Sequence, residues 1–212
     1  MLTNGDVSTT VYTQTMPKLI DHSAREVEVA EAAWRVLVRD GPTRLSVRNV
    51  AAEAGLATGS LRRSFPTQDS LRAFALELVR NRFQRRIESL EPRKTVRATI
   101  STYLEQMLPL DDDRRVEMEV FLAIGTLALT DPALRPAYDA AHAGLAHLCE
   151  AAVGQLVRSG EGYAATDLTM EARRLHALVD GLALHLVRQP PGTPTGWAGD
   201  VLEAHLDSLR TH

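Results

Sequence analysis

The chain has 212 residues, of which 44% are apolar and 5% are aromatic, and its formal net charge is −3. This length fits one large domain or two small ones, and the apolar content is sufficient for a core. The only cysteine, Cys149, excludes an internal disulfide framework and a cysteine-based zinc site, which suits a reducing cytoplasm. No apolar run approaches the roughly 18 residues of a membrane-spanning helix. We therefore expect a cytoplasmic protein that does not interact with a membrane.

Positive charge is concentrated in the front part of the chain. Residues 21–90 contain 12 arginines and no lysine against 9 acidic residues. Residues 91–212 contain 11 basic and 17 acidic residues. A basic front half and an acidic back half indicate that the front half meets a polyanion.

The first 20 residues are polar and rich in threonine, a composition that predicts a disordered tail. The predicted helices begin after it. The segments that follow have helical periodicity, and none is a convincing strand. Residues 22–40 form the first predicted helix, and Gly41 with the proline after it ends this helix. Thr67 caps a helix over residues 68–90, whose two apolar faces are typical of a connector between two packed bodies.

The remaining segments continue in the same style, with breaks at proline and glycine. We predict an all-α fold of about nine helices. A helix-turn-helix domain is expected at residues 21–66, and an effector-binding and dimerisation domain at residues 67–212. The other helices are predicted after Ser46, over 58–64, over 92–108, from Asp111–Asp113 to 130, and over 132–159, 167–189 and 197–210.

The stretch SVRNVAAEAGLATGSLRRSF at residues 46–65 predicts two short helices joined by a tight turn. A steep turn between helices favours glycine at its φ > 0 position, and Gly55 satisfies this requirement. The helices cross closely four residues earlier, where Ala51 is small enough. Ordinary helix corners also use this pattern, but the adjacent arginine pair and the basic front half favour a DNA-binding helix-turn-helix. Residues 58–64 are then its recognition helix.

The exposed side chains of this motif have the chemistry of DNA contacts. The N-terminus of the recognition helix, around Gly59, suits a phosphate because of its free N–H groups and positive dipole end. Arg62 and Arg63 point about 100° apart around the helix axis, so one can read a guanine edge while the other holds phosphate. Arg44 and Arg48 flank the preceding helix and are expected to contact only the DNA backbone. The predicted DNA contacts are Arg44, Ser46, Arg48, Thr58, Gly59, Ser60, Arg62, Arg63 and Gln68.

Residues 30–78, AEAAWRVLVRDGPTRLSVRNVAAEAGLATGSLRRSFPTQDSLRAFALEL, resemble the DNA-binding domain of the TetR family of bacterial transcriptional regulators. The shared features are Asp-Gly after the first helix, Ser-Val-x-x-Val-Ala, Ala-Gly-Leu at the turn, Gly-Ser-Leu on the recognition helix, and Phe65 before a capped helix. The resemblance implies an all-α homodimer that binds a palindromic operator and a small effector, and whose last two helices form the dimer interface. The phrases LTDPALRPAYDAAH and LHALVDGLALHL further resemble members with a betaine-regulator-like C-terminal half.

The segment departs from the usual TetR pattern within its DNA-binding surface. Ala57 stands where the family often has serine, so capping of the recognition helix is expected to fall to Thr58. Arg62 stands where tyrosine is usual. Gln68 replaces a lysine that commonly holds phosphate, and it donates a hydrogen bond without charge, which predicts a shallower salt dependence.

An effector-responsive regulator needs a ligand cavity among its back helices. Few charged residues interrupt the inner apolar stripes, which predicts a mainly apolar effector. Plain core packing is the alternative explanation for each candidate. The candidates for the cavity wall are Phe83, Tyr103, Met107, Met118 and Phe121.

Two leucine-rich stripes near the chain end are candidates for a homodimer interface. They lie on the helices predicted over 167–189 and 197–210, which a Pro- and Gly-containing linker joins. Such helices can pair with their copies across a two-fold axis, and a helix-turn-helix needs a dimer to read two half-sites. Packing within the chain is the alternative. The predicted interface residues are Leu175, Leu178, Leu182, His185, Leu186, Val201, Leu202 and Leu206.

The back half of the chain contains histidines that are candidates for metal ligands. His176 and Asp180 are four residues apart and share a helix face, which suits an ion pair or one corner of a metal site. His142 and His147 are five apart and do not share a face. We expect no metal, no cofactor and no catalytic residue, because the sequence lacks phosphate-binding loops, nucleophile elbows, dinucleotide fingerprints and zinc-protease motifs.

These features predict a ligand-responsive, DNA-binding transcriptional regulator that acts as a repressor. Its expected partners are double-stranded operator DNA, a small-molecule effector and a second copy of the chain. The alternatives are a helical interaction module without DNA binding and a small all-α enzyme. An interaction module has no need of four arginines around one short helix pair, which favours the regulator.

Overall fold

The structure is a computed structural model that describes residues 24–161 and 167–210. Within these ranges it contains nine α-helices and no strand, which confirms the predicted all-α class. The predicted tail at residues 1–20 lies outside the described residues. The helices are α2 (Ala24–Asp40), α3 (Val47–Glu53), α4 (Thr58–Ser64), α5 (Gln68–Glu88), α6 (Val96–Glu105), α7 (Asp112–Ala128), α8 (Arg135–Arg158), α9 (Leu168–Arg188) and α10 (Gly196–Ser208), with a short 3-10 helix η1 (Pro42–Arg44) after α2.

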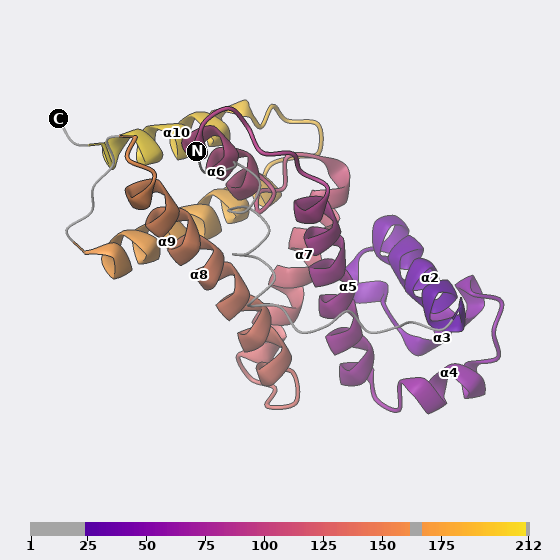
Figure 1. Ribbon diagram of the computed structural model, residues 1–212. Helices are drawn as coiled ribbons and strands as arrows, with labels where there is room; N and C mark the ends of the chain where they lie inside the picture. The colour runs from indigo at the N-terminus through magenta and orange to yellow at the C-terminus, as the bar shows by residue number, and fades with distance from the viewer. Residues whose placement is uncertain (1–23, 162–166, 211–212) are drawn as a thin grey trace.

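The helices form two groups at opposite ends of the molecule (Figure 1). Helices α2, α3 and α4 lie at one end, and α6, α9 and α10 lie at the other, with α5, α7 and α8 between them. One apolar core joins the front helices to α5 and α7, and a second joins α6, α8, α9 and α10. The first core continues into α7 through Val120 and Ile124, so it extends past the domain boundary predicted at residue 66. That boundary stays a prediction.

Two glycines and a serine shape the front helices. Gly41, with φ 77°, ends α2, and the Ser46 side chain accepts a hydrogen bond from the Asn49 N–H and caps α3. Gly55, with φ 66°, makes the turn into α4. The residue before α4 is Ala57, which makes no side-chain cap. The expectation that Thr58 caps this helix is therefore wrong, because Thr58 is already its first residue.

Helix α5 begins with a reciprocal cap and ends beside the back core. The Thr67 side chain accepts from the Ser70 N–H, and the Ser70 hydroxyl bonds back to the Thr67 N–H. Leu71 and Ala75 are buried in the front core, whereas Phe83 packs against the back core. This distribution explains the two apolar faces of the sequence, because the same helix serves both cores.

Helix α6 begins four residues later than the predicted start at residue 92. Thr95 is its N-cap and accepts a hydrogen bond from the Ala98 N–H at 3.1 Å. The Glu161 carboxylate accepts a second one from the Val96 N–H at 2.9 Å. Pro92 therefore lies before the helix and does not open it. The helix begins only after Thr95, where side chains accept hydrogen bonds from its first N–H groups.

We expect Gly55→Ala to lower the free energy of unfolding by about 1 kcal/mol, because an L-residue disfavours a left-handed backbone. The added Cβ meets no atom within 4 Å, so the backbone alone causes the loss. Gly59→Ala is the control, because its Cβ also meets nothing and its φ is not positive. Urea unfolding should show a loss for the first variant and none for the second. Equal losses would contradict the role of the Gly55 backbone.

Candidate functional site

The front end of the molecule carries four exposed arginines. Arg44 follows α2 in the 3-10 helix, Arg48 lies on α3, and Arg62 and Arg63 lie on α4. Within the described part of the chain none of the four forms a salt bridge, although Arg63 approaches the Ser60 hydroxyl at 3.5 Å. Their positive charge therefore stays available to an anionic partner.

The neighbouring arginines of α2 are paired instead, and they hold α3 in place. Arg35 and Arg39 each contact the Glu53 carboxylate at 2.7 Å. The hydrogen bonds from Arg39 and Arg35 hold the pKa of Glu53 below its usual value. On the inner side Val50, Ala51 and Leu61 are buried between the helices. The α3–α4 pair is thus anchored by packing and by ion pairs, with its free arginines outside.

The uncharged residues predicted to contact DNA have partners within the domain. The Ser46 hydroxyl caps α3, and the Gln68 side-chain amide donates to the Leu45 carbonyl at 2.6 Å. A phosphate contact by Gln68 therefore has to use its second N–H. Thr58, Gly59 and Ser60 form the first turn of α4, as predicted.

A cavity of about 160 Å³ lies between α5, α7 and α8. Four of the five predicted wall residues line it, namely Phe83, Met107, Met118 and Phe121. Tyr103 instead faces a smaller neighbouring hollow of about 10 Å³. The structure therefore places Tyr103 apart from the main cavity, in a hollow that it lines together with Ile87 of α5 and Ala152 of α8.

Charged groups in the cavity wall were missed by the sequence interpretation. The wall includes Arg80, Arg86, Arg114 and Glu117 beside its apolar side chains. Glu117 is 5% exposed and faces inward, one turn before Val120 and Phe121 on α7. Position 117 belongs to the apolar stripe of α7. A glutamate at an inward position needs a charged partner, so the sequence itself indicates a buried ion pair here.

Glu117 is held by two arginines of α5. The Arg86 guanidinium donates to both carboxylate oxygens at 2.6 Å, and Arg82 donates at 3.2 Å. Arg82 also bonds Asp113 at 3.0 Å and lies 3.8 Å above the Trp34 ring of α2. One buried carboxylate therefore connects the cavity wall to α2 at the front end of the molecule.

The wall also contains one unused donor. The Arg86 Nε is buried and has no hydrogen-bond partner among the described residues. A buried N–H without an acceptor is costly, so this donor lowers the stability of the wall until an acceptor reaches it. The cavity is thus mainly apolar, and its polar wall residues are Arg80, Arg86, Gln106, Arg114 and Glu117.

Most of the predicted dimer-interface residues are buried within their own chain. A side chain enclosed by its own core cannot also contact a partner, so the prediction is wrong for five residues. The exposed large apolar residues of α9 and α10 are Leu168, Met170, Leu184, Trp197 and Val201, while Leu178 is half-buried and His185 is exposed. The five enclosed residues are Leu175, Leu182, Leu186, Leu202 and Leu206.

Helix α7 also supports the end of α9. The Arg115 guanidinium donates to the Leu186 carbonyl at 3.2 Å and to the Gln189 carbonyl at 2.9 Å. A cation at a helix C-terminus satisfies free carbonyls and interacts favourably with the helix dipole. This contact ties the helix that carries Glu117 to one of the two helices near the chain end.

The single cysteine is not a reactive site. Cys149 is fully buried on α8. Burial raises the pKa of its thiol to about 12. The thiolate needed for nucleophilic chemistry is therefore scarce at neutral pH.

Comparison with known proteins places this architecture in a family. Residues 29–73 match the family model described as bacterial regulatory proteins, tetR family, and residues 96–211 match BetI-type transcriptional repressor, C-terminal. The HTH-type transcriptional regulator PksA of Bacillus subtilis (strain 168) is 36% identical over 195 residues, which are 92% of this chain and 94% of PksA. The chain belongs to the TetR family. Like PksA, it is a DNA-binding transcriptional regulator of that family.

Solved structures share the fold. A transcriptional regulator from Rhodococcus sp. Rha1 has a TM-score of 0.72 at 26% identity, covering 86% of this chain and 94% of that one. The multidrug binding protein EbrR complexed with ethidium has a TM-score of 0.59 at 29% identity, covering 85% and 98%. A regulator from Saccharomonospora viridis in complex with choline has a TM-score of 0.67 at 21% identity, covering 90% and 100%, and supports the fold alone.

Membership of the TetR family favours the regulator over the two alternatives, an interaction module and a small enzyme. The descriptions of both family models and of PksA are those of transcriptional regulators. In the described residues no helix is both long and apolar enough to span a membrane.

We expect Glu117→Leu to lower the free energy of unfolding by about 3 kcal/mol, because it leaves the partly buried Arg86 without its carboxylate and Arg82 with Asp113 alone. The control is Glu119→Leu on the same helix. Glu119 is 36% exposed and pairs only with Arg115, which keeps its carbonyl contacts. That change should cost about 1 kcal/mol or less. Chemical denaturation of both variants makes the comparison, and equal losses would show that Glu117 is an ordinary surface charge.

Proposed function

We propose that the protein is a ligand-responsive repressor that binds a palindromic operator as a homodimer in the cytoplasm. The observation that carries this proposal is the set of four exposed arginines around α3 and α4, which form no salt bridge with the described residues. The match of residues 96–211 to a model of transcriptional repressors supports repression over activation. Release from the operator follows when a small, mainly apolar effector enters the cavity.

Helix α4 is the proposed recognition helix. Its exposed Arg62 and Arg63 are adjacent, so they point in different directions around the helix axis. One guanidinium can donate two parallel hydrogen bonds to a guanine edge, and the other can hold a phosphate. Arg44 and Arg48 extend the same surface and add phosphate contacts. Thr58, Gly59, Ser60, Ser46 and Gln68 complete the proposed contact surface.

The proposed dimer uses the outward faces of α9 and α10. Leu184, Trp197 and Val201 are 37%, 36% and 39% exposed in the single chain, and large apolar side chains gain free energy when a partner covers them. Leu178 and His185 lie on α9 beside this surface. A symmetric pair of these helices places two recognition helices at the spacing of two operator half-sites.

The proposed effector is mainly apolar and has one hydrogen-bond acceptor. Phe83, Met118 and Phe121 supply the apolar wall, and the Arg86 Nε supplies a donor without a partner. The structures of the related EbrR with ethidium and with imidazole support the use of such a cavity for small molecules. Glu117 is already neutralised by its arginines, so it does not by itself favour a cationic effector.

The proposed route of release runs through α5. A ligand that contacts Arg86 disturbs the Glu117 pair, which Arg82 shares. Arg82 lies on Trp34, so the position of α2 depends on the same pair. A ligand that binds more tightly to the conformation in which the recognition helices no longer fit the operator shifts the population away from DNA.

We expect Arg63→Ala to weaken operator binding by about 1–3 kcal/mol, because a bidentate base contact is worth this much. Fluorescence anisotropy on the operator and on single-base variants of it measures the effect. Loss of discrimination at one base pair assigns Arg63 to base reading, whereas an equal loss on every sequence assigns it to phosphate. Arg93→Ala is the control, since Arg93 lies before α6, outside the proposed surface. Unchanged affinity in Arg63→Ala would contradict the proposed recognition helix.

We expect the double variant Leu184→Glu with Val201→Glu to be monomeric in light scattering, because each protomer then buries two charges at the two-fold interface. Leu129→Glu is the matched control, since this leucine is 71% exposed at the end of α7. The control should remain dimeric. If the double variant also remains dimeric, the interface lies on another face of the molecule.

A further inference from the structure

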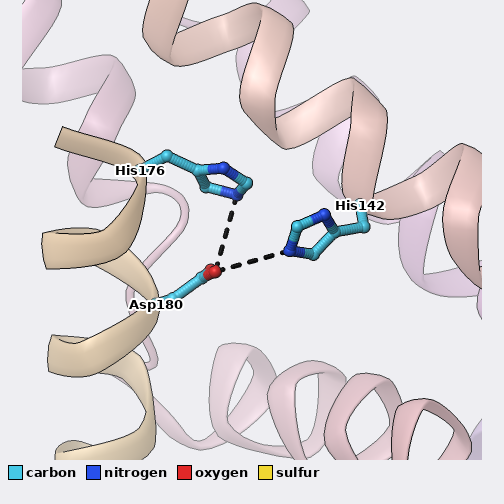
Figure 2. Close-up of side chains that lie close together, drawn as sticks. All are labelled: His142, His176 and Asp180. Carbon is cyan, nitrogen blue, oxygen red and sulfur yellow. Dashed lines mark ion pairs between the residues drawn. The ribbon is translucent and has the colours of Figure 1, made fainter. Parts of the chain in front are cut away.

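A cluster of two histidines and one aspartate lies between α8 and α9 (Figure 2). His142 comes from α8, whereas His176 and Asp180 come from α9. The Nε2 atoms of both histidines approach the same carboxylate oxygen of Asp180, at 3.5 Å from His142 and 3.6 Å from His176. None of the three residues lines the effector cavity.

The fold completes a pattern that the sequence shows only in part. His176 and Asp180 share a face of α9, as their spacing predicts. His142 is 34 residues before His176, so no spacing rule predicts that the two meet. The packing of α8 along α9 brings its imidazole to the same point.

We propose that His142, His176 and Asp180 bind a divalent transition-metal ion such as Zn²⁺. Two imidazoles and a carboxylate are ligands that such ions take in proteins. Tetrahedral ligands about 2.0–2.1 Å from zinc lie about 3.3 Å from one another. One candidate ligand atom from each residue lies within 4.8 Å of the others, so small side-chain rotations complete the geometry.

One nitrogen of the cluster lacks a hydrogen bond, and it belongs to His176. Its Nε2 is buried and has no hydrogen-bond partner among the described residues. The Asp180 oxygen at 3.6 Å is too far away to accept one. A metal ion satisfies this lone pair and the carboxylate together. The side chains of His142 and Asp180 are 43% and 44% exposed, which leaves a path for the ion from solvent.

An ion pair alone is the competing explanation. Asp180 attracts a protonated imidazole, and the two histidine rings also pack with their centroids 4.7 Å apart. The explanations differ in chemistry, because a metal needs neutral imidazoles with free nitrogen lone pairs, whereas an ion pair needs a protonated ring. Only the metal site predicts saturable uptake of a transition metal.

The position of this site links it to the rest of the molecule. Ala141 and Gly144, on either side of His142, line the effector cavity. A series of ring contacts runs from Phe121 in the cavity wall through Tyr138 to His142, with centroids 5.0 and 6.0 Å apart. A bound ion ties α8, which lines the cavity, to α9, a helix of the proposed dimer interface.

The test is calorimetric titration of the full chain with ZnCl₂, after removal of any purification tag and treatment with chelator. Wild type is expected to take up one ion per chain. His142→Ala and Asp180→Asn should weaken binding about tenfold or more, since even partners that only orient a ligand are worth this much. Both side chains are only partly buried, at 43% and 44% exposure, so the variants should keep the wild-type circular dichroism spectrum.

His147→Ala and Glu150→Gln are the matched controls, because they change an exposed histidine and an exposed carboxylate of α8 outside the cluster. Their zinc affinity should equal that of wild type. Zinc should also raise the thermal unfolding temperature of wild type and of the controls, but not of the two cluster variants. Absence of a one-to-one site in wild type, or equal affinity in the cluster variants and the controls, would overturn the assignment.

Discussion

A buried carboxylate has to be neutralised where it lies, and in this protein that constraint joins three helices. Glu117 of α7 is enclosed beside the cavity and is held by Arg86 and Arg82 of α5. Arg82 in turn lies on the ring of Trp34 in α2. Removing one partner of such a group leaves an uncompensated buried charge, so the three helices keep a fixed arrangement. The cavity and the front helices are therefore not independent bodies joined by a simple linker.

The features that local backbone chemistry determines could be predicted from the sequence. Gly55 adopts the expected positive φ, and α4 spans Thr58 to Ser64 as expected. These elements depend on neighbours in sequence, such as caps, turn residues and helical periodicity. Four of the five residues predicted for the cavity do line it, because inward positions follow from the period of each helix, but most of its wall was not predicted. Tyr103 was the exception, since its helix turns that face toward a different hollow.

The features that depend on which helix packs against which could not be predicted. A leucine stripe shows that a helix face is covered, but not whether its own chain or a partner covers it, so Leu175 and Leu206 were assigned to the wrong surface. The partners of Glu117 lie 31 and 35 residues away, and no spacing rule connects them. His142 and Asp180 meet only because α8 and α9 pack together.

The most direct test of the account is whether the chain distinguishes its operator from other DNA. Fluorescence anisotropy of the purified protein compares DNA from upstream of its own gene with a scrambled sequence, over a series of salt concentrations. We expect tight binding to the native fragment and no such binding to the scrambled sequence. The logarithm of the affinity for the native fragment should fall linearly with the logarithm of the salt concentration. Equal, weak binding to both sequences, repeated across a library of genomic fragments, would contradict sequence-specific regulation by this protein.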